Sequence, residues 1–463
     1  MTNKEFNREV ELPGTYQSPR VSSETMDCSL PMTFDHLSLC SMGCKFCFSF
    51  YSKSNNAMLA EGSSRRVPVN LRSADMPKMM LTMQGKNITD KRSQSLYNNF
   101  YKKKFILHWG GLADPFCNFE AHNMVGYPFI NFLGEMNYPT LFSFKGSAIL
   151  KKEYIQLFEK YSNQKNFAFQ ISMVTIDNGK SKNVEVGVPS PTVRLKIMKI
   201  LSDLGYFTIL RLRPFILGIT DETLDELLDA ALKAGMQGIS TEFFALDARA
   251  NVGMMERYKW LAEQTGIDDL LKYFAKLSPR ERGTYRRLNW KVKEYWVKKI
   301  FLFCQKHNLV FGCSDPDFKE LNSSGSCCSL SDNFPANKGL ENWSRDQLTY
   351  HLKEARKHYH RTGKQRILSF DGVYTKNATF LDDVEFHDDH VSVIGKSQPI
   401  RNATTVRHVI SRHWNSLGSP ANPRNYFDRK LEPCGKDSKG YMLYKYNPRP
   451  YEAEWVKEGI DLT

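Results

Sequence analysis

The chain has 463 residues, which corresponds to about three domains or to one large domain with appendages. Its 41% hydrophobic, 13% aromatic and 25% charged residues are typical of a folded protein and exclude wholesale disorder, collagen and coiled coil. No apolar run is long enough to cross a bilayer, which excludes an integral membrane protein. The 64 Lys and Arg outnumber the 50 Asp and Glu by 14, a surplus typical of proteins with polyanionic partners but also of proteins that are simply soluble.

The polar lead of the chain, residues 1–30, has no apolar segment in its first 14 residues, so we expect no signal peptide and a cytoplasmic location. From 53 to 98 the sequence is rich in Ser, Asn, Lys and Arg, which predicts a long insertion loop. Short apolar runs then alternate with helical patterns. The runs are 34–39, 105–109, 140–144, 167–173, 207–212, 238–244 and 309–312, and the helices are 151–161, 191–204 and 221–234. This alternation predicts an α/β fold with a parallel sheet, closed or partly closed.

The pattern also predicts the domain organisation. We expect a barrel core over 31–250, completion of the barrel over 251–335, and a basic C-terminal domain over 336–463. Barrels of parallel strands place their sites at the carboxyl ends of the strands. The candidate residues at those ends are polar or ligand-type: Cys40, Gly110, Gly111, Lys145, Ser172, Arg211, Glu242 and Cys313.

Three cysteines follow the first predicted strand with the spacing Cys40-x-x-x-Cys44-x-x-Cys47. In a reducing compartment such a group indicates metal binding rather than disulfides. Three thiolates on one loop can hold three irons of a [4Fe–4S] cluster and leave the fourth iron open. The alternative is a structural zinc site, which normally takes four ligands.

The triplet and four further segments resemble the radical S-adenosylmethionine (SAM) superfamily, and within it the spore photoproduct lyase and DNA repair photolyase-like branch. The resemblance covers about 33–247, and the further segments are 110–116, 143–147, 189–195 and 212–221. It implies a partial (β/α)6-type barrel with a C-terminal α+β extension. It also implies a [4Fe–4S] cluster, SAM as cofactor, and a reductase partner such as flavodoxin or ferredoxin.

The resemblance assigns roles to the strand-end residues. Gly110 and Gly111 would bind the methionyl amino group of SAM, Lys145 and Ser172 its carboxylate, and Arg211 or Glu242 its ribose or carboxylate. Each polar side chain has an ordinary structural alternative, as a solvated lysine, a cap or a salt-bridge partner. Cys117 is the candidate catalytic hydrogen donor, and core packing is the alternative for it.

A second group of cysteines lies in a Gly- and Ser-rich segment and consists of Cys313, Cys327 and Cys328. After the barrel, this group resembles an auxiliary [4Fe–4S] site, with Cys434, Cys304, a substrate atom or nothing as the fourth ligand. A zinc knuckle and free thiols remain alternatives.

Basic residues interleaved with Trp and Tyr between 280 and 299 can contact a phosphate backbone and stack bases. They are Arg280, Arg282, Arg286, Arg287, Lys291, Lys293, Lys298 and Lys299, and a second basic stretch covers 351–361. An amphipathic helix with a solvated lysine face is the alternative. We therefore predict a radical SAM enzyme that repairs or modifies a nucleobase, with DNA as the favoured nucleic acid. The alternatives are a radical SAM enzyme acting on a peptide or small nucleotide, and a non-catalytic zinc protein that binds nucleic acid.

Overall fold

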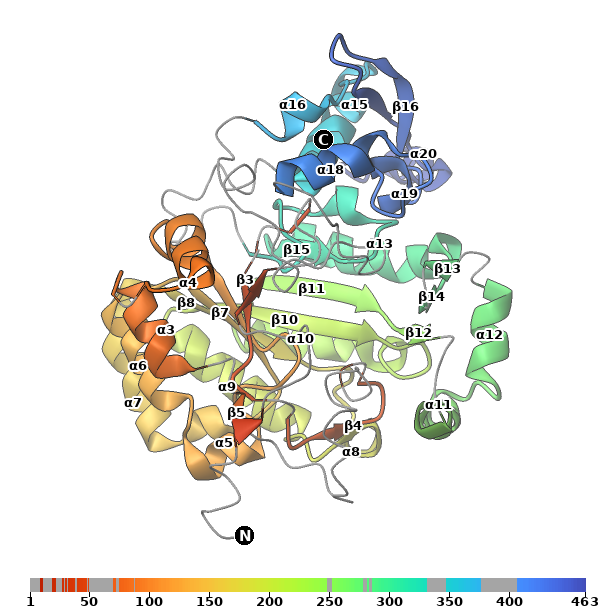
Figure 1. Cartoon of the computed structure of the whole chain (residues 1–463). Coiled ribbons are helices and arrows are strands. Elements are labelled where there is room, and N and C mark those ends of the chain that lie inside the picture. The colour runs from red at the N-terminus through yellow and green to blue at the C-terminus, as the bar shows by residue number, and fades with distance from the viewer. Residues whose placement is uncertain are drawn as a thin grey trace. The chain divides into compact units, whose positions relative to one another are not determined.

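The structure is a computed structural model of the whole chain (Figure 1). It describes residues 9–10, 19–21, 27–28, 30, 32–37, 40–47, 49, 70–71, 75–86, 88–247, 252–277, 281–282, 285–330, 347–375 and 406–463. The chain divides into two compact units. The first comprises 1–20, 32–237 and 242–288, and the second comprises 21–31, 238–241 and 289–463.

The first unit is built on a parallel sheet. Its neighbouring strands are β3 (Met32–Phe34), β6 (Leu107–Trp109), β7 (Thr140–Phe144), β8 (Phe167–Ser172) and β10 (Phe207–Phe215), in that order. The helices that follow β6, β7, β8 and β10 along the chain are α5 (Asn118–Asn123), α6 (Tyr127–Glu135), α7 (Lys152–Tyr161), α8 (Asn178–Val184), α9 (Pro191–Asp203) and α10 (Leu224–Lys233). Strands and helices alternate along the chain (Figure 1), which confirms the predicted α/β class.

Smaller elements complete the first unit. β4 (Gly43–Cys44) pairs with β9 (Glu185–Val186), and β12 (Ala245–Asp247), β14 (Tyr285–Arg287) and β13 (Glu281–Arg282) form a three-stranded sheet. β1 (Glu9–Val10) pairs with β5 (Asn70–Leu71). Two further helices are α11 (Val252–Thr265) and α12 (Leu270–Leu277).

The two faces of the parallel sheet differ in chemistry. Side chains alternate along a strand, so residues two apart share a face. One face is aromatic: Phe142 of β7 lies between Trp109 and Phe169, and Phe158 of α7 packs edge-on to Phe169 at 5.1 Å. This face is the core, because the helices cover it. The other face carries polar side chains and is described below with the site.

Local sequence signals explain where the helices begin. The Ser190 hydroxyl accepts a hydrogen bond from the Val193 N–H, and Pro191 occupies the first turn, so α9 starts where the strand-to-helix connection ends. The predicted helix at 221 starts instead with a 3₁₀ turn over Asp221–Thr223. The Thr220 hydroxyl caps nothing there; it accepts the Ile216 N–H at 3.0 Å.

The segment 53–98 was expected to be one long loop, and this is wrong for its second half. α3 (Met76–Met83) and α4 (Lys91–Leu96) lie there, followed by a π-helical turn, Tyr97–Tyr101. Asp75 and Asp90 cap the two helices by accepting backbone N–H groups, and burial of Met79 and Met83 holds α3 in place. The low average hydrophobicity concealed two short helices that are stabilised by tertiary packing.

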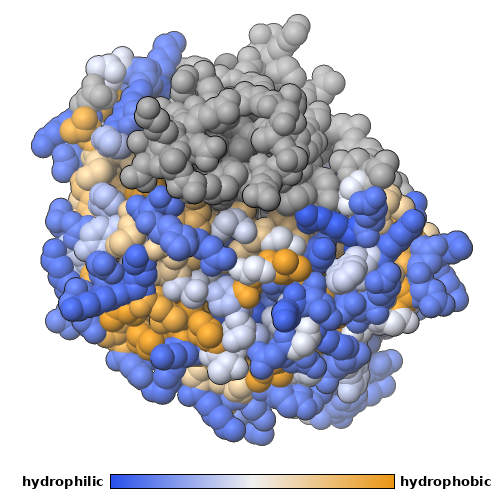
Figure 2. All heavy atoms as spheres, turned by 90° about the horizontal axis from the view of Figure 1, so that it is seen from below, coloured by the Kyte–Doolittle hydropathy of each residue, from blue (hydrophilic) through white to orange (hydrophobic). Residues whose placement is uncertain are grey.

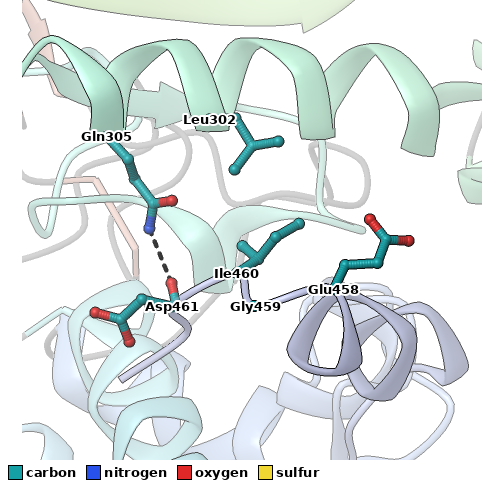
Figure 3. Close-up of a pocket in the computed structure, with 6 residues that line it drawn as sticks. All are labelled: Leu302, Gln305, Glu458, Gly459, Ile460 and Asp461. Atoms are coloured by element: carbon teal, nitrogen blue, oxygen red, sulfur yellow. Dashed lines mark hydrogen bonds between the residues drawn. The ribbon is translucent and has the colours of Figure 1, made fainter.

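The second unit contains helices and a hairpin. Its elements are β15 (Val310–Cys313), which pairs in parallel with 238–241 of β11 (Gly238–Phe243), α13 (Trp290–Lys306), α15 (Leu348–Thr362), α16 (Phe370–Val373), α18 (Val406–Asn415), α19 (Pro423–Tyr426), β16 (Leu431–Lys436), β17 (Met442–Tyr446) and α20 (Pro450–Lys457). A groove beside α13 is lined by six residues (Figure 3), where the Gln305 side chain donates to the Asp461 carbonyl at 2.8 Å. No helix in the described part of the chain is long and apolar enough to span a membrane.

We predict that Phe142→Ala lowers the free energy of unfolding by about 3–5 kcal/mol, because it empties a site enclosed by aromatic rings. Leu81→Ala, at a side chain that is 40% exposed, should cost far less. Urea denaturation of both variants measures the difference, and equal costs would contradict the assignment of Phe142 to the core.

Candidate active site

The three cysteines of the predicted cluster loop lie together in apolar surroundings. Cys44 is buried, and Cys40 and Cys47 are half-buried and pack against the same hydrophobic cluster, with Phe46 beside them. The buried members of this cluster are Leu37, Met42, Cys44, Ala113, Cys117 and Phe119. Pairing of β4 with β9 fixes the backbone of Cys44 opposite Glu185. The strand before the loop ends at Phe34, five residues earlier than predicted; 38 and 39 lie outside the described residues.

The thiols are close enough to influence one another electrostatically. Burial raises the pKa of Cys40, and the neighbouring thiols of Cys47 and Cys44 raise it further. Burial also raises the pKa of Cys44 to about 12, although the ammonium of Lys145 opposes this shift. Metal binding therefore has to displace protons from these thiols.

The donor set fits an iron–sulfur cluster. Within the described part of the chain, no three Cys, His, Asp or Glu side chains surround a point where one metal ion would bind. A [4Fe–4S] cluster makes a different demand, because each cysteine binds a separate iron and the sulfurs stay apart. Three soft thiols, grouped within an apolar shell, meet that demand.

The loop after β6 is held by two buried carboxylates. Asp35 accepts the N–H groups of Leu112 and Ala113 at 2.9 and 3.0 Å. Asp114 accepts the Phe116 N–H at 2.8 Å, and its other oxygen accepts the N–H groups of Lys145 and Gly146 from the loop after β7. Asp114 therefore ties the two strand-end loops together.

Two glycines let these loops come close. Gly110 has φ +103°, and a Cβ there would lie 2.2 Å from the Ser143 carbonyl oxygen. A Cβ on Gly146 would lie 1.9 Å from the Phe116 carbonyl oxygen. Neither position has room for a side chain, so glycine is required at both.

Lys145 lies beside the cysteine loop. Its ammonium is 5.0 Å from the centre of the Phe46 ring and 2.6 Å from Oε1 of Glu185. Arg194 of α9 pairs with Oε2 of Glu185 at 2.5 Å and also donates to the Ser172 carbonyl at 2.6 Å. Burial by itself raises the pKa of Glu185, but Arg194 and Lys145 outweigh it and hold the pKa at about 2.

The polar face of the sheet continues away from this ion cluster. His108, the Ser143 hydroxyl and the Gln170 amide form a chain across β6, β7 and β8, with distances of 2.8 and 2.6 Å. One step further along, Ser172 is the register partner of Arg211, and their side chains are 3.5 Å apart. The candidate residues Ser172 and Arg211 therefore lie on one face of the sheet.

Glu242, at the end of β11, lies among arginines. Arg287 of β14 contacts its Oε1 at 3.0 Å. Burial raises the pKa of Glu242, but Arg287, Arg213 and Arg211 together lower it below its usual value. Arg213 shares the face of Arg211 because the two are two residues apart on β10. Arg211 and Glu242, both predicted from strand ends, are thus electrostatic neighbours.

Cys117 is fully buried in the same hydrophobic cluster as the cluster-loop cysteines and occupies the N-cap position of α5 without a side-chain capping hydrogen bond. Burial raises its pKa, and the nearby Asp114 raises it further. Its thiol is therefore protonated and sheltered from water, as both a hydrogen donor and a core cysteine would be.

The second cysteine group lies in the second unit. Cys313 ends β15 and is buried, and the Cys327 carbonyl comes so close to Gly312 that a Cβ there would lie 2.9 Å away. Cys328 is buried too, whereas Cys434 is exposed on the β16–β17 hairpin. Cys304 is buried in α13.

Sequence reasoning missed the residues that hold the site together: Asp35, His108, Asp114, Gln170, Glu185, Arg194 and Arg213. Asp114 stands inside a segment that carried the resemblance, and Gln170 and Arg213 are two residues from predicted strand-end residues, so period-two spacing could have indicated them. Arg194 lies inside 189–195, another segment that carried the resemblance, whereas Glu185 gave no such signal.

No protein-family model and no curated protein matches this chain. Among solved structures, a spore photoproduct lyase complexed with dinucleoside spore photoproduct is 12% identical, with a TM-score of 0.47 over 66% of this chain and 81% of its own. A spore photoproduct lyase variant with bound AdoMet gives the same identity and coverage and a TM-score of 0.46. SuiB of Streptococcus suis bound to precursor peptide SuiA is 11% identical, with a TM-score of 0.38 over 61% of this chain and 48% of its own.

We predict that Gly110→Ala destabilises the first unit by about 3 kcal/mol or more, because it combines a strained φ with a clash against Ser143. Gly266→Ala is the matched control: Gly266 has φ +68° but nothing within 4 Å, so only the strain of about 1–2 kcal/mol remains. Thermal and urea denaturation measure both, and equal losses would show that the loop can relax away from Ser143.

Proposed function

We propose that this chain is a radical SAM enzyme whose Cys40, Cys44 and Cys47 hold a [4Fe–4S] cluster. The observation that carries the proposal is the gathering of these three thiols in one apolar cluster, beside loops at the carboxyl ends of β6 and β7. When bound, the cluster supplies the electron that cleaves SAM to a 5′-deoxyadenosyl radical.

The chain's own residues give this chemistry its setting. The apolar shell around the thiols excludes water. Asp35 accepts backbone N–H groups of the loop of Gly110 and Gly111, and Asp114 ties this loop to the loop after β7, so the carbonyl groups of the loop keep a fixed direction for the methionyl amino group. Ser172, Arg211 and Glu242 supply hydrogen-bonding groups on the polar face for the rest of SAM.

Three further assignments belong to this proposal. Lys145 already pairs with Glu185, so we assign it chiefly to positioning the cysteine loop and only secondarily to the carboxylate of SAM. Cys117 is proposed as the hydrogen donor, supported by its burial beside the cluster loop. Cys313, Cys327 and Cys328 are proposed to hold an auxiliary cluster, supported by the packing of the 327–328 segment against β15.

We expect anaerobic reconstitution with iron and sulfide to give a brown protein that converts SAM to 5′-deoxyadenosine with dithionite. Cys40→Ala should remove about four irons per chain and abolish the conversion, because three thiolates are needed to hold the cube. Cys313→Ala should also lose about four irons but keep the SAM-binding cluster. Iron analysis and chromatography of 5′-deoxyadenosine are the measurements.

Cys304→Ala is the control, since Cys304 is a buried cysteine of the second unit, like Cys313, that packs in α13. It should keep the iron content and the conversion. A colourless protein that takes up zinc and leaves SAM intact would overturn the proposal.

For the substrate, we propose a nucleic acid, with DNA favoured. One face of α13 carries Lys291, Tyr295 and Lys299, and Tyr295 is 62% exposed. Tyr295 contacts Trp296 edge-on at 4.7 Å, and the Lys299 ammonium lies 5.8 Å from the Trp296 ring. An exposed ring flanked by lysines can stack a base and contact phosphates.

Not every basic residue of this segment is available for that role. Lys293 is buried and paired with Asp315 and Asp317, so it belongs to the core of the second unit. Arg287 pairs with Glu242. Arg280 and the Arg282 side chain lie outside the described residues. In the second basic stretch, His351 is buried in α15.

We predict salt-dependent binding of single-stranded DNA that weakens about tenfold in Tyr295→Ala, because one stacking contact contributes about 1–3 kcal/mol. Leu417→Ala, at another exposed apolar side chain of the second unit, is the control and should bind normally. Fluorescence anisotropy at two salt concentrations measures this. Absence of binding at low salt would favour the peptide or small-nucleotide alternative.

A further inference from the structure

A surface of the first unit lies directly over the cluster loop. The Lys45 N–H donates to the Val184 carbonyl at 2.9 Å, which continues the β4–β9 pairing. Arg257 of α11 donates to the Cys44 carbonyl at 3.0 Å. The Lys45 ammonium lies 4.9 Å from the centre of the Trp260 ring, and the Trp260 indole donates to the Asn183 carbonyl of α8. Thus α8, α11 and β9 frame the backbone between two of the proposed cluster ligands.

This surface is apolar at its centre. Val186 is 43% exposed and Trp260 is 39% exposed, whereas most large hydrophobic side chains of the described residues are buried. Val186 lies against Gly43, since a Cβ on that glycine would be 3.5 Å from the Val186 Cβ. Figure 2 views the molecule from the side on which Figure 1 places β4, α8 and α11, and there hydrophobic patches lie among hydrophilic residues.

The border of the surface is mainly basic. Lys182 of α8 and Lys259 of α11 are exposed and adjoin Asn183 and Trp260 in sequence. Together with Lys45 and Arg257 they make four cations, against the exposed carboxylates of Glu256 and Glu263 on α11. The balance is positive, and a mixed apolar and basic surface of this kind favours an acidic protein partner.

We infer that this surface, defined by Lys45, Lys182, Val186, Lys259 and Trp260, is the docking site for a small acidic protein that carries single electrons. The inference rests on the proposed function, whose reaction consumes one electron for each SAM cleaved. One electron leaves the reduced carrier, which is oxidised, and enters the cluster, which is reduced. No atom or proton is transferred at this step.

The location suits this partner because electron transfer needs a short route from the surface to the cluster. Trp260 and Arg257 contact Lys45 and the Cys44 carbonyl, so a protein docked on Trp260 is separated from a cluster ligand by one layer of side chains. The partly exposed indole ring of Trp260 also lies within the basic border. Aromatic residues in this position are typical anchors of a protein interface.

The test compares two reductants, reduced flavodoxin and dithionite, in forming 5′-deoxyadenosine. In Lys182→Glu/Lys259→Glu we expect the flavodoxin-dependent rate at low salt to fall at least about tenfold, since reversed charges on a border slow association. The dithionite-dependent rate should stay within about twofold, since dithionite is a small molecule and needs no docking site. Trp260→Ala should raise the KM for flavodoxin and also the Kd of oxidised flavodoxin, measured by isothermal titration calorimetry, with the same unchanged dithionite rate.

Lys152→Glu, at an exposed lysine on α7, is the matched control and should respond normally to both reductants. If the double variant and Trp260→Ala use flavodoxin as well as the control does, the docking site is wrong while the proposed function stands. If neither reductant yields 5′-deoxyadenosine in the reconstituted wild-type chain, the proposed function fails and the inference falls with it.

Discussion

The buried carboxylate of Glu185 is the interaction on which the geometry of the site depends. It forms ion pairs with Lys145, which lies over Phe46, and with Arg194. Arg194 also donates a hydrogen bond to the Ser172 carbonyl and so holds the end of β8. Its own backbone pairs with Cys44. Removing one member of such a buried group leaves an uncompensated charge, which typically costs about 3–5 kcal/mol. The cysteine loop, the loop after β7 and the end of β8 are therefore positioned as one piece.

Because side chains alternate along each strand, one face of the sheet carries the core residues that stabilise the fold and the other carries the polar residues of the site. Phe142, Phe169 and Phe158 supply ring contacts on the face that the helices cover. Polar groups from Gln170 to Arg211 occupy the other face at alternate positions of the same strands. A change in register of one residue would exchange the two faces, so the aromatic core also fixes which side chains reach the site.

Many of the strands and helices could be predicted from the hydrophobic pattern of the sequence. The strands at 140–144 and 167–173 and the helices at 151–161 and 191–204 appear within one or two residues, because apolar runs bounded by turn residues are a local signal. The prediction of a loop over 53–98 was wrong at α3 and α4. Each helix is capped by an Asp, and α3 is also stabilised by burial of its own Met79 and Met83. Lys293 looked like a nucleic-acid contact and is a core ion pair, since Asp315 and Asp317 approach it from another segment.

By itself, the sequence determined the α/β class, the cysteine triplet and the row of polar residues at strand ends, because spacing along the chain encodes each of them. Only the tertiary structure decided that Lys145 pairs with Glu185, that three arginines surround Glu242, and that Trp260 lies against Lys45. Those contacts join residues that are tens to hundreds of positions apart. Their partners are selected by the packing of the sheet and its helices, and ion pairing between distant charges leaves no periodic trace in a single sequence.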